Sequence, residues 1–319
     1  MADERAALRA RRRERWAGVG FLLIAIVWGG TFPVVKDLVE RVPPHALIAA
    51  RFGLAWVALA GWAWQRRHRW EPGLQLAGAL LGLVLWGGFL TQTLGLQYTS
   101  ASKAGFITAL NVVFVAVMAS LFLGKRSGPL TWTGVALATA GLAVLSLDWS
   151  AGLRAEPGDL LVLLCAVLFA LHIVLVDRFS PRFDPVLFAW VQMGTVALVS
   201  GCTAMAAHGG GGLVGVAEPG SVLPLLYLGL LATAGALVAQ VSLQRFTAPA
   251  RVGLILSLEP VFAALFAWLL LGERLAPSGW VGGALVMAGV LLAEVDTARG
   301  AGQGQAAAAA GGQAAAAGE

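Results

Sequence analysis

Glu259 is an acidic residue inside an apolar stretch of the chain, residues 250–271. It lies nine residues into this stretch. In a helix it would then be about 14 Å deep, roughly half of a ~30 Å hydrocarbon core. A carboxyl group at that depth is costly and needs a reason to be there. It could bind a polar molecule or carry a proton along a pathway. The alternative is a protonated or paired residue that only fixes helix packing.

Asn111 corresponds to Glu259 in an internal repeat. Residues 102–144 and 250–292 align without a gap at an offset of 148, with 18 identities in 43 positions. Pro260 follows Glu259 directly and leaves a helix carbonyl without its usual N–H donor. A free carbonyl beside a carboxyl group makes a polar niche. We expect Asn111 and Glu259 to approach each other near the middle of the membrane.

Three further polar residues, Gln92, His172 and Gln240, also lie deep within apolar stretches. Amide groups and an imidazole can hydrogen-bond a zwitterion or a hydroxylated molecule. The alternative is that each only joins two helices, as polar side chains do within membranes. His172 is the strongest candidate of the three, because the charge of a histidine can change near neutral pH.

Arg51 and Trp28 have counterparts in the second half at an offset of 141, namely Gln192 and Phe169. Arg51 could bind an anionic group or pair with an acid. It could equally extend its charged end to the outer membrane surface. Trp28 could line a pathway or stack on a bound molecule, or it could be a packing or interfacial aromatic.

The composition places all of these residues in lipid. Hydrophobic residues make up 58% of the chain and charged residues 12%, and the mean hydropathy is +0.79. Soluble domains carry about 25% charged residues, so this chain cannot cover a water-facing surface. Its spans must be helical, because unpaired backbone groups are not tolerated in hydrocarbon. Ten spans are predicted, at residues 16–36, 44–64, 74–97, 100–123, 130–148, 158–177, 185–206, 221–243, 250–271 and 277–294.

Each half holds five spans, an odd number, so the two halves must be inverted relative to each other. We therefore predict an all-α polytopic membrane protein, with ten transmembrane helices arranged as two inverted five-helix repeats. With the N-terminus inside, 16 Lys and Arg residues are cytoplasmic and five are external, which predicts N-in and C-in. The predicted units are a basic cytoplasmic N-terminus at 1–15, repeats at 16–148 and 158–294, and a disordered Ala/Gly/Gln cytoplasmic tail at 296–319.

Several other classes of protein do not fit. The net charge of +5 is explained by cytoplasmic loops and not by nucleic-acid binding. The two cysteines lie in apolar runs and predict neither a disulfide framework nor a metal site. Phosphate-loop, zinc-protease and hydrolase motifs are absent, so we expect no ATP-driven step, no catalysis and no cofactor. The glycine pairs Gly134/Gly282 and Gly141/Gly289 predict helix contacts and offer a face for a homodimer.

Five short motifs stand at corresponding places along the spans. They are Trp28-Gly29-x-x-Phe32, Arg51-Phe52, Thr99-Ser100-Ala101-Ser102-Lys103-Ala104, Leu258-Glu259-Pro260-Val261-Phe262 and Leu271-Gly272-Glu273-Arg274-Leu275. Together they resemble the drug/metabolite transporter superfamily, and its EamA-type permeases in particular, over residues 16–294. Two residues depart from that pattern. Val112 stands where the family often has a proline that kinks the fourth span, and Lys125 stands where the second repeat has Glu273.

The resemblance implies a ten-helix inner-membrane permease that exports amino acids or other small metabolites or drugs. We predict a multi-pass secondary transporter in contact with lipid, which exposes a midplane site to each side in turn. Cargo gradients or protons would drive it. One rival is a membrane-embedded enzyme, which would need a cluster of His, Asp or Ser at one interface. The other is a non-transporting scaffold, which would not need polar repeat counterparts at the midplane.

Overall fold

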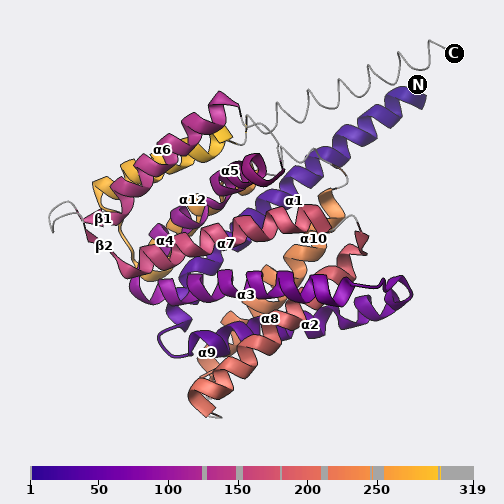
Figure 1. Ribbon diagram of the computed structural model, residues 1–319. Helices are drawn as coiled ribbons and strands as arrows, with labels where there is room; N and C mark the ends of the chain where they lie inside the picture. The colour runs from indigo at the N-terminus through magenta and orange to yellow at the C-terminus, as the bar shows by residue number, and fades with distance from the viewer. Residues whose placement is uncertain are drawn as a thin grey trace.

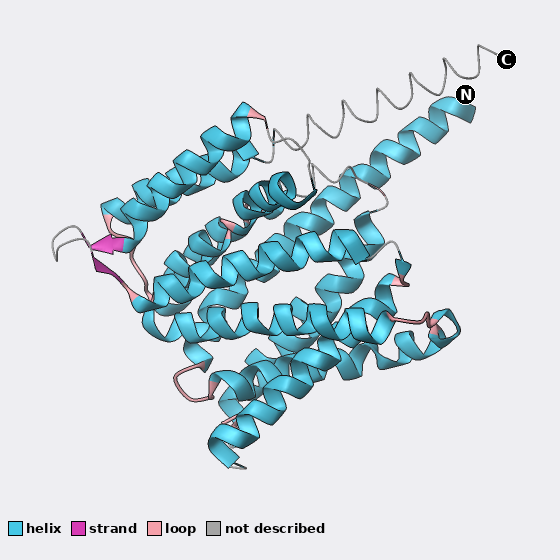
Figure 2. Cartoon of the chain, in the orientation of Figure 1, coloured by secondary structure: helices cyan, strands magenta, loops and turns pink. Residues whose placement is uncertain are grey.

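The structure is a computed structural model that describes residues 2–123, 128–148, 154–179, 182–209, 215–244, 246, 255–293 and 295. It is a bundle of helices (Figures 1 and 2). The long helices are α1 (Ala2–Leu38), α2 (Pro44–Gln65), α3 (Leu74–Tyr98), α7 (Pro157–Phe179) and α8 (Pro185–His208). The shorter ones are η1 (Arg67–Arg69), α4 (Ala101–Thr108), α5 (Asn111–Leu123), α6 (Pro129–Ser146), α9 (Pro219–Leu226), η4 (Tyr227–Gly235), α10 (Ala236–Gln244), α12 (Glu259–Leu271) and a last helix, Pro277–Ala293. Two antiparallel strands of two residues each, β1 (Leu147–Asp148) and β2 (Arg154–Ala155), lie between α6 and α7.

Six helical segments of the described chain are long and apolar enough to cross a membrane. They are Arg15–Leu38, Pro44–Gln65, Leu74–Tyr98, Pro157–Val176, Pro185–His208 and Pro219–Gln240. Four shorter apolar helical segments are Ala101–Val115, which includes α4 and the start of α5, and Pro129–Leu145, Glu259–Leu271 and Pro277–Ala293. Large apolar side chains cover the outward faces; Leu198 is 68% and Leu223 75% exposed. Such surfaces suit lipid, and the predicted all-helical polytopic character is confirmed. The predicted tail at 296–319 and Lys125 lie outside the described residues.

The predicted span 100–123 is two helices, because the chain breaks between α4 and α5 at residues 109–110. There the Leu110 N–H donates to the carbonyl of Ile107, three residues back, at 3.1 Å. That bond tightens the helix locally and ends its regular ladder. No proline causes the break, since position 112 is Val112. The absence of the family's proline therefore does not remove the interruption.

The second half has the same interruption before α12. The Leu258 N–H donates to the carbonyl of Ile255, also three residues back, at 3.1 Å, and residues 257–258 form the turn. Both partners are 148 residues beyond their counterparts in the first half. Here Pro260 occupies the first turn of α12, where a missing N–H is tolerated. Asn111 and Glu259 are thus the first residues of the two half-helices that follow the breaks.

The segment of η4, Tyr227–Gly235, is a π-helix between α9 and α10. Its hydrogen bonds reach one residue further back than those of an α-helix. Thr233 shows this directly, because its hydroxyl donates to the Leu228 carbonyl, five residues earlier, at 2.7 Å. Such wider turns reorient side chains and free carbonyls for partners on other helices.

The matched glycines bring α6 and the helix Pro277–Ala293 into backbone contact. A Cβ atom on Gly134 would lie 2.5 Å from the Gly289 carbonyl oxygen, and one on Gly141 would lie 2.7 Å from the Gly282 carbonyl oxygen. The predicted helix contacts are therefore present. These glycines pack against each other within one chain, and the homodimer stays a prediction.

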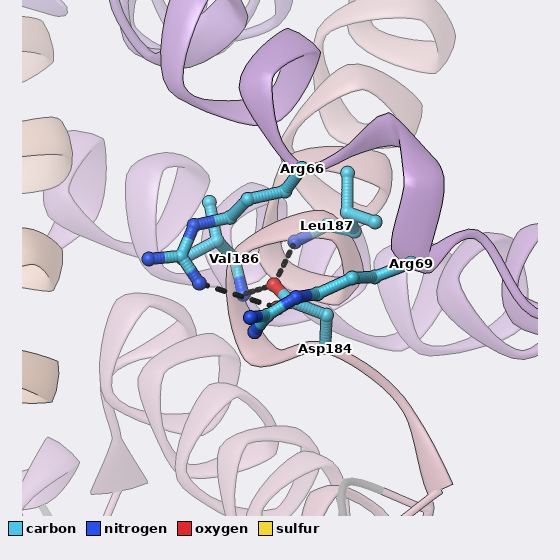
Figure 3. Close-up of polar contacts among 5 residues, drawn as sticks. All are labelled: Arg66, Arg69, Asp184, Val186 and Leu187. Carbon is cyan, nitrogen blue, oxygen red and sulfur yellow. Dashed lines mark hydrogen bonds and ion pairs between the residues drawn. The ribbon is translucent and has the colours of Figure 1, made fainter.

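Asp184 anchors the start of α8 and binds the segment that follows α2 (Figure 3). Its Oδ1 accepts the backbone N–H groups of Val186 and Leu187 at 3.0 and 3.3 Å. Its Oδ2 pairs with Arg66 and Arg69 at 3.2 and 3.3 Å. Burial by itself would raise the pKa of this carboxyl. The backbone N–H groups and Arg66 outweigh burial and hold the pKa below its ordinary value.

Glu273 makes a second polar connection, beyond the other end of α3. Its carboxylate accepts the backbone N–H groups of Ala101 and Ser102 at 2.9 and 3.1 Å, and the Ser102 hydroxyl at 2.9 Å. A carboxylate favours a helix N-terminus, because the unpaired N–H groups there carry partial positive charge. This acid from the second half therefore caps α4 of the first half.

Candidate functional site

A cavity of about 500 Å³ lies where the two broken helices meet the rest of the bundle. Its volume is in the range of sites for small organic molecules, ~300–1,000 Å³. All seven residues predicted from the sequence line it: Trp28, Arg51, Gln92, Asn111, His172, Gln240 and Glu259. They come from α1, α2, α3, α5, α7, α10 and α12, respectively. Residues that are distant in sequence thus bring their polar groups together in one cavity whose walls are mostly apolar.

Arg51 is only 7% exposed. Its Nε donates to the hydroxyl of Thr233 at 2.9 Å. Its guanidinium carbon lies 4.8 Å from the centre of the Phe89 ring, a cation–π distance. The guanidinium is therefore inside the bundle, and the alternative in which it reaches the outer membrane surface does not hold.

Glu259 and Asn111 line the cavity from the first turns of α12 and α5. Within the described residues, neither side chain has a hydrogen-bond partner, although Glu259 and Arg51 interact electrostatically. No ion pair joins those two groups in the described part of the chain. A carboxyl group and a guanidinium thus share one chamber without neutralising each other through contact.

His172 and Gln92 each contact another polar side chain. His172 Nε2 lies 2.6 Å from Gln192 Oε1, so Gln192, the repeat counterpart of Arg51, holds the imidazole. Gln92 Nε2 donates to the Thr108 hydroxyl at 3.4 Å, a long bond. Both contacts join two helices, as the alternative interpretation requires. Both residues also line the cavity, so joining helices and lining a site are compatible here.

Aromatic rings form much of the apolar wall. Trp28 Nε1 donates to the Ala232 carbonyl of the π-helix at 2.9 Å, which fixes the indole. Phe169, its counterpart at offset 141, also lines the cavity. Phe89 contacts Phe52 and Phe169, with ring centres 4.7 and 5.1 Å apart. The chamber therefore combines charged and amide groups with flat apolar surfaces.

Thr233, Thr108 and Phe89 line the cavity and were not predicted from the sequence. Threonine and phenylalanine are ordinary residues of membrane helices, so neither draws notice alone. For the predicted residues the repeat supplies a signal, because Gln92 and Gln240 are 148 residues apart, like Asn111 and Glu259. Nothing comparable points to Thr233. Within the described residues, no group of three or more His, Cys, Asp or Glu side chains could hold a metal ion.

The match to a known protein family falls into two parts that correspond to the two repeats of the chain. The sequence profile of the EamA-like transporter family matches residues 15–147 and again residues 156–294. A solved structure titled "Crystal structure of protein" aligns with a TM-score of 0.61, over 88% of this chain and 96% of that one. Its sequence is 20% identical, so the likeness concerns the fold alone.

Three relatives illustrate the sequence similarity. An "uncharacterized transporter" of Archaeoglobus fulgidus is 31% identical over 281 residues, 87% of this chain and 85% of that protein. A "probable terminal-alkyne amino-acid exporter" of Streptantibioticus cattleyicolor is 30% identical over 293 residues, 87% of this chain and 92% of that protein. An "uncharacterized inner membrane transporter" of Escherichia coli is 28% identical over 272 residues, 84% of this chain and 87% of that protein.

Proposed function

Because this multi-pass membrane protein belongs to the EamA-like transporter family, we propose that it is a secondary transporter that exports small zwitterionic metabolites, amino acids above all. The observation that carries the proposal is the cavity of about 500 Å³ lined by all seven predicted residues. A guanidinium suits a carboxylate, and a carboxyl group suits an ammonium ion. Both groups stand in one chamber, beside aromatic walls that would accommodate an apolar side chain.

The two interrupted helices support alternating access. In many transporters built from inverted repeats, discontinuous helices form the central site, and one repeat rocks against the other. Here the breaks at 109–110 and 257–258 occupy equivalent repeat positions. The half-helices α5 and α12 both begin at the cavity, with Asn111 and Glu259. We propose that this region is the shared site and that the units 16–148 and 158–294 move around it.

We propose ten spans with both termini in the cytoplasm. The 16-to-5 distribution of Lys and Arg supports this orientation. Figure 1 supports an odd number of crossings in the first half, because the start of α1 and the strands β1 and β2 lie at opposite ends of the bundle. The four shorter apolar helices would complete the spans together with the six longer ones.

The proposed direction of transport and the proposed kind of cargo have support of their own. The Streptantibioticus cattleyicolor relative is named an amino-acid exporter. In this chain, Glu259 is the proposed proton carrier, because its carboxyl group has no hydrogen-bond partner in the described structure and lies in the cavity. A proton that enters on this group while cargo leaves would couple export to a proton gradient.

Flux measurements on the purified protein test the proposal. Liposomes that contain the protein and a radiolabelled amino acid, with leucine, phenylalanine and threonine tested in turn, should lose label faster than protein-free liposomes. A pH gradient should change that rate. A comparison of growth medium from cells with and without the protein would supply further candidate cargos. If none of these compounds is moved in either direction, the proposed function fails.

A further inference from the structure

Arg51 and Glu259 carry opposite charges and line one cavity, yet within the described residues no ion pair joins them. The Arg51 guanidinium interacts electrostatically with Tyr227 and with Glu259. Away from water such attraction is much stronger than at a protein surface. Arginine has a long and flexible side chain that can move to a partner. Some part of the structure must therefore hold the guanidinium where it is.

The hydrogen bond to Thr233 is the one directional contact that Arg51 makes within the described residues. It joins Nε to the Thr233 hydroxyl oxygen at 2.9 Å and fixes the plane of the guanidinium. The rings of Phe89 and Phe52, with centres 4.8 and 5.7 Å from the guanidinium carbon, add contacts that tolerate sliding. The N–H groups of the two terminal nitrogens have no hydrogen-bond partner in the described structure. They remain available to a bound molecule.

Thr233 can accept this bond because its hydroxyl hydrogen is already donated to a carbonyl within the π-helix. Its hydroxyl donates to the Leu228 carbonyl at 2.7 Å, which leaves its lone pairs for Arg51. In an α-helix a threonine hydroxyl reaches three or four residues back, whereas here it reaches five. The π-helix therefore orients the acceptor as well as placing it. Its Ala232 carbonyl also holds the indole of Trp28, so this segment fixes two cavity residues.

We propose that Thr233 is a positioning residue that keeps the Arg51 guanidinium apart from Glu259, so that both charges stay free for cargo. The value of this arrangement for cargo binding rests on the proposed function, whereas the experiment below does not depend on it. Without the hydroxyl, Arg51 would turn toward Glu259 and form the ion pair. The cavity would then lose the two groups that recognise opposite charges.

A double-mutant cycle on the purified full-length protein in detergent tests this without any cargo. Glu259→Gln is made alone, with Thr233→Val and with Thr233→Ser, and the melting temperature of each protein is measured. Valine keeps the branched shape and removes the acceptor, whereas serine keeps the hydroxyl. We expect Glu259→Gln to lower the melting temperature by at least about 2 °C more in the valine background than in wild type, a difference of about 1 kcal/mol for a chain of this size. The serine background should behave as wild type.

Additive effects of Thr233→Val and Glu259→Gln would overturn the proposal, because they would show that no new pair forms. So would a serine background that behaves like the valine one. If the valine variant does not accumulate in folded form, Thr233→Ala replaces it in the same cycle. A positive cycle in a protein that moves no amino acid would leave the positioning role standing and refute the proposed function alone.

Discussion

At the scale of single residues, Glu259 gives the most direct test of the proposed function. Glu259→Gln keeps the size of the side chain and mimics its protonated state. If Glu259 couples protons, this variant should lose transport driven by a pH gradient but keep exchange of cargo across the membrane. If it binds an ammonium group, cargo affinity should fall by about tenfold or more, as expected for a lost charge-assisted hydrogen bond. Glu40→Gln, at an exposed acid, is the matched control. Transport and pH dependence equal to wild type would contradict both roles.

Asp184 makes a prediction about stability and acid. Its pKa in the folded protein is held below the ordinary value, chiefly by backbone N–H groups and Arg66 against the effect of burial. Its stabilisation is then complete above the ordinary aspartate pKa and is lost as the pH falls through the lower folded-state value. Asp184→Asn should cost about 0.5–2 kcal/mol at neutral pH, as for a lost helix cap. Melting curves in detergent between neutral and strongly acidic pH should converge for the two proteins. A constant difference would contradict the assignment.

At the scale of elements, the contact between α6 and the helix Pro277–Ala293 leaves no room for a side chain. In Gly141→Ala the new Cβ would lie 2.6 Å from the Val286 backbone nitrogen, so one helix must shift. We expect a loss of about 1–3 kcal/mol, typical of overpacking. Gly61→Ala is the control, because nothing lies within 4 Å of its Cβ position. Melting temperatures of both variants check this, and equal values would show that the helices separate without cost.

The interruption between α4 and α5 forms without a proline, which makes a further prediction about that element. Val112 lies in the first turn of α5, at the repeat position of Pro260. Its N–H donates only to the Ala109 carbonyl, three residues back at 3.2 Å, so a proline there removes one bond outside the regular helix ladder. Val112→Pro should therefore keep the protein folded. Phe114→Pro should not, because the Phe114 N–H donates to the Leu110 carbonyl at 2.9 Å inside the helix. The yield of monodisperse protein on size-exclusion chromatography distinguishes the two variants. Equally low yields would show that α5 does not begin as a new helix after the break.

At the scale of the whole molecule, the proposed inverted arrangement predicts which segments face the cytoplasm. Glu218, in the bend before α9, and His68, in η1, are both exposed, and the proposed ten-span topology places Glu218 outside and His68 inside. In a background with Cys202, which is exposed, replaced by serine, an impermeant maleimide should label Glu218→Cys in intact cells. His68→Cys should react only after the cells are opened. The reverse pattern, or labelling of both in intact cells, would refute the topology.

The membrane setting, most helix positions, the family resemblance and seven of the residues that line the cavity could be predicted from the sequence. These follow from composition, from the length of apolar runs and from the high cost of a polar group in hydrocarbon, all of which are local properties. The repeat added the correspondence of Asn111 with Glu259. The packing of the helices was needed to show that Thr233, 182 residues away, binds Arg51, and that within the described residues no ion pair joins Arg51 to Glu259. It alone showed that the matched glycines meet within one chain and that α5 begins without a proline. Each of these depends on which helices pack together, and contacts between side chains far apart in sequence leave no local pattern.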